Sequence, residues 1–355
     1  MQSRLITYPD SSRWNDFVSS SLECPVLQSF EWGELKAHFG WEPLRIAIED
    51  NDKIIAAISI LKKKIPYLNY PIFYAPRGPV VDFSNKELVD YLLNAVEKEA
   101  EKSRAVSLKI DPDISERPVA SLARISALGF LKASRQIQPR ATILLDLDRE
   151  LDDIIKGFEE KTRYNIRLSD RKGVIVREEP TLKGIEAFYK LYQETAARDK
   201  FSIHPLKYYQ KIREIMFTAG LGSNFVAYFA GEPVAAVIVF CFGRKIWYMY
   251  GASSANYRNV MPNHLLHWEI IKWAKARNLK VYDLWGIPVE PKVGHPLYGV
   301  YRFKKGFNGR TVVNIGAYDF PYSPLFYNIF EHGVVWFKNI RSLLTKGKIV
   351  DSLGE

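Results

Sequence analysis

Cysteine and histidine are scarce in this chain. Its 355 residues include two cysteines, Cys24 and Cys241, and six histidines. Two cysteines cannot supply a disulfide framework or a zinc ligand set, so a reducing, cytoplasmic compartment is expected. His264 and His267 lie three residues apart, but no third ligand accompanies them, and neither a metal nor a cofactor is expected.

Long apolar runs are missing as well. The longest, Pro233 to Phe242, is far shorter than the about 20 residues that span a bilayer. The first residues, Met1 to Leu5, lack the apolar segment of a signal peptide. The chain is therefore expected to be neither exported by that route nor integral to a membrane. It also lacks a P-loop and a Gly-x-Ser-x-Gly elbow, which favours direct transfer chemistry over a covalent serine intermediate.

Charge and length set the remaining bounds. Fifty Lys and Arg against 40 Asp and Glu give a net charge of +10. This charge suits a polyanionic partner such as RNA, a nucleotide phosphate or an acidic membrane surface, although plain basicity is an equal reading. At about 150 residues per domain, the length predicts two domains.

The two halves of the chain repeat one order of elements. In each half, a turn precedes an apolar run that carries an Ala-Ala pair, and a further strand, a long helix and a short strand ending in an acid follow. The pairs are Ala56-Ala57 and Ala235-Ala236, and the acids are Asp111 and Asp283. A spacing of about 170 to 180 residues between equivalent positions indicates a duplicated α/β domain, with a cleft between the copies.

Local patterns place the elements. Runs rich in β-branched residues predict strands, and apolar spacing of 3.6 residues predicts helices. In the first half, strands are expected at 41–48, 54–61, 71–74 and 106–110, with a helix that opens at the capping box 84–87. In the second half, strands are expected at 143–145, 224–229, 233–242, 245–250 and 281–285, helical segments at 148–158 and 160–171, and a helix with Pro262 at its first position.

These patterns divide the chain into three parts. We expect a first domain over residues 1–140, a second over 141–315, and a C-terminal segment over 316–355 that has no repeat. Within that segment, residues 326–344 are patterned as a basic amphipathic helix. Such a helix either packs on the first domain or makes peripheral contact with the inner membrane surface.

Five short strings occur in order along most of the chain: Gln28–Trp32 continuing to Lys36, Lys109–Asp113, Tyr250–Ser253, Pro262–Leu266 and Tyr301–Phe307. Together they resemble the Fem (FemABX) family of peptidoglycan-bridge aminoacyltransferases. The stretch 160–167 is similar to that family too. No long coiled-coil insert is present, so the resemblance is to the shorter, arm-less members, which are often monomeric.

This resemblance implies two tandem GNAT-type domains, each a central mixed sheet flanked by helices. It implies an enzyme that transfers an amino acid from aminoacyl-tRNA to the stem-peptide amine of UDP-MurNAc-pentapeptide or of its lipid-linked form, lipid II. Residues 77–87 and 250–264 lack the pyrophosphate-binding motif of acetyl-CoA-dependent GNAT enzymes, which disfavours acetyl-CoA. Two alternatives stay open: an acyltransferase with another acyl donor, acting on a glycan or protein, and a non-catalytic RNA-binding protein.

The resemblance implies that two sets of residues bind the precursor. Lys36 aligns with the family lysine that holds the diphosphate, and Trp32 belongs to the same string; without the resemblance, Lys36 would be read as a solvated helix lysine. Tyr248 and Tyr250 align with tyrosines of the precursor channel, or they are core aromatics. Strand alternation would place both tyrosines on one side of the sheet.

The pair Phe303-Lys304 aligns with the family pair whose lysine lies near the transferring carbonyl. A fixed cation there would stabilise the oxyanion or the departing ribose oxygen, and Lys305 is the alternative for this role. Arg302 and Lys305 are also candidates for a surface that contacts the tRNA acceptor stem through its phosphates.

Asp111 follows a strand at the end where GNAT sites open, so it is a candidate general base. Its Asp-Pro-Asp turn is equally suited to a structural Asx cap, and the family also permits a substrate-assisted mechanism. Where arm-less relatives can place an arginine against the diphosphate, this chain has His204, followed by Tyr208. Arg198 is expected to compensate for the weaker phosphate binding of a neutral histidine.

Overall fold

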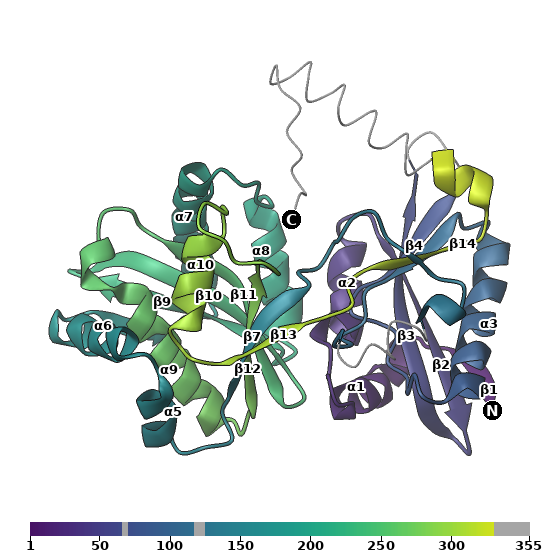
Figure 1. Ribbon diagram of the computed structural model, residues 1–355, viewed down its shortest axis with the longest axis horizontal. Helices are drawn as coiled ribbons and strands as arrows, with labels where there is room; N and C mark the ends of the chain where they lie inside the picture. The colour runs from purple at the N-terminus through teal and green to yellow at the C-terminus, as the bar shows by residue number, and fades with distance from the viewer. Residues whose placement is uncertain (66–69, 117–124, 330–355) are drawn as a thin grey trace. The chain divides into compact units, whose positions relative to one another are not determined.

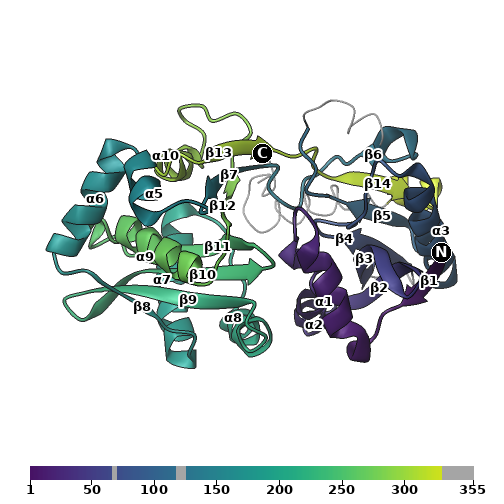
Figure 2. The same cartoon turned by 90° about the horizontal axis from the view of Figure 1, so that it is seen from below.

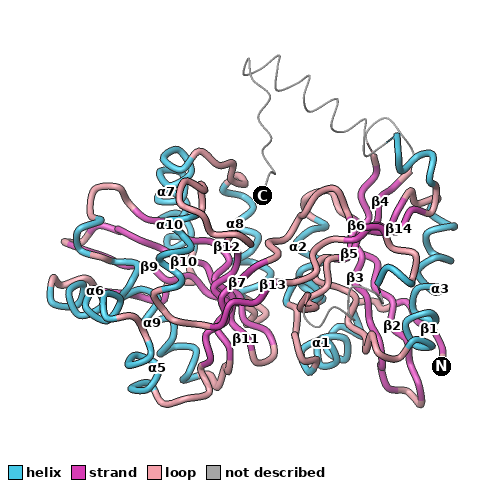
Figure 3. Tube along the Cα trace, in the orientation of Figure 1, coloured by secondary structure: helices cyan, strands magenta, loops and turns pink. Residues whose placement is uncertain are grey.

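The computed structural model describes residues 1–65, 70–116 and 125–329. Its chain divides into two compact units. The first unit consists of residues 1–140 and 314–355, and the second unit consists of residues 141–313. Figure 1 carries the element labels used below, and Figure 3 shows the strands of each unit in magenta with the helices in cyan around them.

The first unit is built on a seven-stranded mixed sheet in the order β1-β2-β3-β4-β5-β14-β6. Its neighbouring strands are antiparallel except β4 and β5, which are parallel. The strands are β1 (Gln2–Leu5), β2 (Glu42–Asp50), β3 (Lys53–Lys64), β4 (Pro71–Ala75), β5 (Ser107–Ile110), β6 (Leu131–Lys132) and β14 (Tyr318–Pro321).

Helices cover both faces of this sheet. As Figure 2 shows, α1 and α2 lie on one side of the strands and α3 on the other. The helix expected to open at residues 84–87 does form. Its N-cap is Asn85, whose side chain accepts a hydrogen bond from the Leu88 amide, whereas Ser84 donates to Asp82. The bounds are α1 (Ser11–Ser20), α2 (Phe30–Ala37) and α3 (Lys86–Ser103).

The second unit repeats this architecture with the sheet order β13-β7-β12-β11-β10-β9-β8, in which only β11 and β12 are parallel. Its strands are β7 (Ala141–Asp146), β8 (Ile175–Glu178), β9 (Gly222–Phe229), β10 (Glu232–Phe242), β11 (Lys245–Ser253), β12 (Val281–Ile287) and β13 (Arg310–Val313). Its helices are α5 (Leu151–Gly157), α6 (Glu160–Arg171), α7 (Leu182–Asp199), α8 (Leu206–Ile212), α9 (Pro262–Ala276) and α10 (Tyr298–Lys305).

The predicted order of elements in the two halves is confirmed. Each unit has an antiparallel hairpin (β2-β3 and β9-β10), a third strand, a helix, and a strand parallel to the third. Pro262 is the first residue of α9, where its fixed φ suits the helix and its missing amide hydrogen costs no bond. Each sheet has its own apolar core, so each unit positions its site residues on a packed scaffold.

The chain leaves and re-enters the first unit. β7 follows the first unit in sequence but pairs with β12, and β14 follows the second unit but pairs with β5. Residues 324–329 are helical, and the remainder of the amphipathic helix expected over 326–344 lies outside the described residues. Among the described helices, none has the length and apolar character needed to cross a membrane.

Candidate active site

The two parallel strands of the second unit separate at their carboxyl ends. The pairing of β11 with β12 ends at Trp247 and Asp283, although the strands continue to Ser253 and Ile287. The cause lies in β12, where the Asp283 carboxylate accepts the Trp285 amide at 2.8 Å and Trp285 adopts a φ of 59°. The register with β7 shifts at the same place, and Trp285 and Gly286 lie beyond the last pair with β11.

Lys304 binds the backbone carbonyls of Trp285 and Gly286. Its Nζ donates to the oxygen of Gly286 at 2.7 Å and to that of Trp285 at 3.3 Å, and lies 5.2 Å from the centre of the Tyr248 ring. The side chain is 5% exposed. Burial lowers the pKa of Lys304 to about 7, against the opposing effect of the Asp283 charge. Near neutral pH this amine can therefore either hold or release a proton.

The other α10 candidates divide between the two sides of the helix. Phe303 lies 5.1 Å from the ring of His264 and 5.4 Å from that of His267, inside the aromatic packing. Arg302 and Lys305 are exposed. The buried lysine of the run is thus Lys304, and its two basic neighbours face solvent.

His267 contributes to the surroundings of Lys304, although from the sequence it was considered only as a weak metal-ligand candidate. It is 1% exposed, its Nδ1 lies 2.8 Å from the Tyr282 hydroxyl, and its Nε2 has no hydrogen-bond partner among the described residues. Burial, the Lys304 charge and His264 lower the pKa of His267 to about 3. The ring is therefore neutral and forms an aromatic wall beside the lysine.

The expectation that Tyr248 and Tyr250 share one side of β11 is wrong. β10 pairs Val239 with Tyr248 but Ile238 with Tyr250, so Met249 is an extra residue that breaks the alternation. Tyr248 consequently packs against His267 of α9, and Tyr250 packs against aromatic rings of α7 and α8, those of Tyr192 and Tyr209.

His204 and Tyr208 lie near Tyr250, and Arg198 lies at the end of the same strand. Arg198 donates to the Ser253 carbonyl at 2.9 Å and forms an ion pair with Asp199, which raises the pKa of the guanidinium. The exposed His204 ring stacks on the buried Tyr208 ring, with their centres 4.0 Å apart. The α7-α8 side of β11 therefore presents an aromatic surface with one arginine at its edge.

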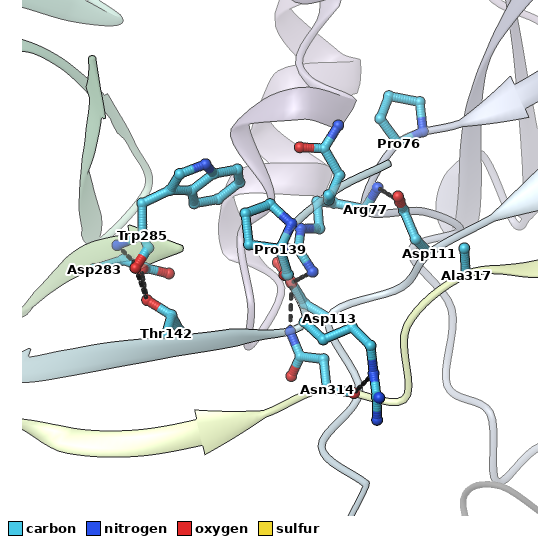
Figure 4. A network of polar contacts seen from close by, with 12 residues as sticks. Pro76, Arg77, Asp111, Asp113, Pro139, Thr142, Asp283, Trp285, Asn314 and Ala317 are labelled. Carbon is cyan, nitrogen blue, oxygen red and sulfur yellow. Dashed lines mark hydrogen bonds and ion pairs between the residues drawn. The ribbon is translucent and has the colours of Figure 1, made fainter. Parts of the chain in front are cut away.

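In the first unit, Asp111 is 1% exposed and both its oxygens accept hydrogen bonds. The Tyr74 hydroxyl donates to Oδ2 at 2.8 Å. The Arg77 amide donates to Oδ1 at 2.6 Å, as Figure 4 shows. Burial raises the pKa of Asp111 to about 6, although Arg77 opposes the shift. The Arg77 guanidinium also binds Asp113 at 2.9 Å and the Pro139 carbonyl at 2.7 Å, so the carboxylate belongs to a closed network.

Lys36 and Trp32 lie together on α2, with Nζ 4.6 Å from the centre of the ring. Burial and the charge of Lys63 lower the pKa of Lys36 to about 8. Lys63 lies 5.2 Å over the ring of Trp41. Two cations that repel each other on aromatic surfaces favour an anion beside them.

The structure thus groups the expected residues into three sets: Trp32 with Lys36; Phe303 and Lys304 with Tyr248; and Arg198, His204 and Tyr208 with Tyr250. Asp111 stands in its own network. The sequence analysis missed Lys63, Tyr74, Arg77, His267 and the bulge at Trp285. Of these, Arg77 alone carried a local signal, as it lies in the turn Pro76-Arg77-Gly78-Pro79.

Comparisons with known proteins bear on both units. A model of the FemAB family matches residues 10–218 and 225–332. Lipid II:glycine glycyltransferases from Staphylococcus saprophyticus and Staphylococcus aureus (strain MRSA252) are 27% and 26% identical, and each match covers 94% of this chain and 95% of the relative.

Solved structures agree with the fold. The crystal structure of FemX matches with a TM-score of 0.86 at 25% identity, covering 93% of this chain and 100% of that chain. A tandem GNAT protein from the clavulanic acid biosynthesis pathway matches with a TM-score of 0.55 at 10% identity, covering 91% and 99%. The predicted fold class of two tandem GNAT-type domains is confirmed.

Proposed function

We propose that this chain, which belongs to the FemAB family, transfers an amino acid from aminoacyl-tRNA to the stem-peptide amine of a peptidoglycan precursor. Because the Staphylococcus relatives are named lipid II:glycine glycyltransferases, we take the lipid-linked form as the first acceptor and UDP-MurNAc-pentapeptide as the second. The observation that carries the proposal is the buried Lys304, held by two carbonyls beside a bulged strand. The enzyme is proposed to act as a cytoplasmic monomer.

The reaction is the aminolysis of an ester. The acceptor amine has an ordinary pKa of about 10.4, so it must lose a proton before its nitrogen attacks the carbonyl carbon. The resulting tetrahedral intermediate carries an oxyanion. When it collapses, the ester C–O bond breaks and the C–N bond remains. The nitrogen gives up its further proton to water to become the amide, and the ribose oxygen takes a proton and leaves as a hydroxyl.

Lys304 is suited to two of these steps. Protonated, it donates a hydrogen bond to the oxyanion in a site from which burial excludes water. With a pKa of about 7, it can afterwards release that proton to the departing ribose oxygen. The neutral His267 and Phe303 keep the surroundings apolar, and the exposed Arg302 and Lys305 are proposed to contact tRNA phosphates.

Candidate contacts to the precursor are proposed within each unit separately. Lys36 binds the diphosphate, with Trp32 beneath its ammonium group. Tyr248 and Tyr250 line the path of the stem peptide, and Arg198, His204 and Tyr208 complete this surface. Because the Arg198 guanidinium is already paired with Asp199, its contribution to phosphate binding is the smaller one.

For Asp111, we propose a structural role in place of general base catalysis. Both of its oxygens are bonded within the first unit and the side chain is buried, so it has little capacity to take a proton from a bound amine. The acceptor amine then loses its proton to a substrate group or to water. This substrate-assisted mechanism needs no protein base.

Mass spectrometry tests the reaction. The lipid-linked precursor and UDP-MurNAc-pentapeptide would each be incubated with the protein and a mixed aminoacyl-tRNA pool, with and without ribonuclease. We expect the lipid-linked precursor to gain the mass of at least one amino-acid residue, and ribonuclease to abolish the gain. No gain on either acceptor, together with transfer from an acyl-CoA, would replace the proposal with an acyl-CoA-dependent acyltransferase.

A further inference from the structure

A concave surface of the first unit carries a strong excess of positive charge. A cavity of about 580 Å³ lies where β3 ends and β4 begins, next to the end of α3. Five basic side chains line it against one carboxylate, that of Glu42: Lys62, Lys63, Lys64, Lys102 and Arg104. By contrast, the cavity at β8 is lined by two basic and two acidic side chains, so this imbalance distinguishes the basic pocket, as we name it.

The fold explains why these cations converge. Lys62–Lys64 end β3, and Arg104 ends α3 as a C-cap residue in the left-handed conformation, with a φ of 53°. Lys64, Lys102 and Arg104 are exposed, and Lys102 also forms an ion pair with Glu99 at 2.6 Å. Since like charges at one rim repel, the arrangement favours a ligand that carries several negative charges.

Exposed aliphatic side chains lie beside the basic pocket. The helical turn at 324–329 is attached there, because the amides of Tyr322 and Ser323 donate to the Val106 carbonyl and Phe326 packs on Tyr70, with ring centres 4.8 Å apart. Tyr70 directly precedes Pro71, which lines the pocket. On this turn, Leu325 is 68% exposed and Ile329 is 53% exposed.

We propose that the basic pocket and the adjacent Leu325 and Ile329 dock the protein on an anionic phospholipid surface. The lysines and Arg104 bind headgroup phosphates, while Leu325 and Ile329 enter the boundary between headgroups and acyl chains. Trp41, which also lines the pocket, is a residue type that favours this boundary. An RNA backbone would use the cations but gain nothing from exposed Leu and Ile. The docking surface does not depend on the proposed reaction.

Co-sedimentation of the full chain with vesicles tests the docking surface, using phosphatidylcholine with and without phosphatidylglycerol. The variant Lys64→Gln/Lys102→Gln/Arg104→Gln should bind the anionic vesicles about 100-fold more weakly, at roughly 1 kcal/mol per basic residue. The matched control Lys53→Gln/Lys86→Gln/Lys132→Gln removes three exposed lysines of the same unit and should bind within about threefold of the unaltered protein.

A second variant distinguishes docking on a lipid surface from binding to RNA. Leu325→Ser keeps all charges and should weaken vesicle binding about fivefold, without changing the affinity for an RNA duplex. The proposal is overturned if the unaltered protein binds neutral and anionic vesicles equally, or if both triple variants lose binding to the same extent. It is likewise overturned if the pocket variant loses RNA binding but keeps vesicle binding. The first comparison needs no variant, so misfolding cannot obscure it.

Discussion

The two units place an aspartate at the same point of the fold, but they surround it differently. In the first unit, β4 ends at Ala75, where its pairing with β5 also ends, and the next turn returns the Arg77 amide to Asp111. In the second unit, β11 continues beyond its last pair with β12, and Asp283 binds the Trp285 amide. A carboxylate network occupies the first strand end, whereas at the second the strands separate and a buried lysine binds two of the carbonyls of β12.

At both strand ends, burial favours the neutral form of the ionisable side chain. It raises the pKa of Asp111 to about 6 and lowers that of Lys304 to about 7, so each group is moved toward its neutral form. Of the two groups, the lysine lies where the parallel strands separate. We therefore expect the chemistry in the second unit and expect structural and binding roles in the first.

The largest expected effect comes from Lys304→Met, which removes the cation and keeps the length of the side chain. We expect kcat to fall about 10²- to 10³-fold, the usual cost of one oxyanion donor. Steady-state transfer assays with saturating aminoacyl-tRNA would measure it. The control Lys280→Met removes an exposed lysine, paired with Asp148 at the start of β12, and should leave kcat unchanged. A Lys304→Met enzyme within about threefold of the unaltered one would remove the difference between the two strand ends.

Gly251→Ala tests the bulged strand itself. A Cβ at Gly251 would overlap the Tyr248 hydroxyl, so Tyr248 must move from its place beside Lys304. We expect the free energy of unfolding to fall by about 1–3 kcal/mol, measured by urea denaturation, with a lower kcat. Gly299→Ala in α10 meets no atom within 4 Å and should be neutral or slightly stabilising. Equal stability of both variants would contradict the described position of Tyr248.

Lys36→Met examines binding in the first unit. Loss of one charged contact to a phosphate should raise the KM for the precursor about 10-fold, with kcat nearly unchanged. Lys53→Met, at the exposed start of β3, is the matched control. A fall in kcat at constant KM would assign Lys36 to the chemical step and reverse the division of roles between the units.

Sequence patterns predicted the scaffold better than the site. Hairpins, α6, α9 and the parallel strands follow from local periodicity and turn residues, which act over a few positions. The bulge at Met249 did not follow, because an extra residue in one strand is defined only by its partner strand. Strand β14 was not predicted for a similar reason, because its pairing with β5 joins distant parts of the chain.

At the site, the family resemblance favoured Lys304 as the candidate and kept Lys305 as the alternative, with no physical argument to distinguish the two. That distinction depends on which side of α10 faces the sheet. His267 was read only as half of a weak metal pair, whereas burial makes it a neutral wall beside Lys304. Burial of a polar side chain is a tertiary property, so local patterns do not report it.

The smallest effect on activity is expected for Asp111→Asn, with kcat within about threefold, because the carboxylate faces its own network. The substitution should instead change how the stability of the protein depends on pH. The folded pKa of about 6 exceeds the ordinary value of 3.8, so between these values the folded state holds a proton that the unfolded state has lost. The free energy of unfolding therefore falls as pH rises from about 4 to about 6, by on the order of 2 kcal/mol.

Denaturant unfolding across this range should show that slope in the unaltered protein and in the exposed control Asp50→Asn, but not in Asp111→Asn. A loss of kcat of more than about 10²-fold with unchanged unfolding curves would instead make Asp111 the general base, and the first unit would share the chemistry.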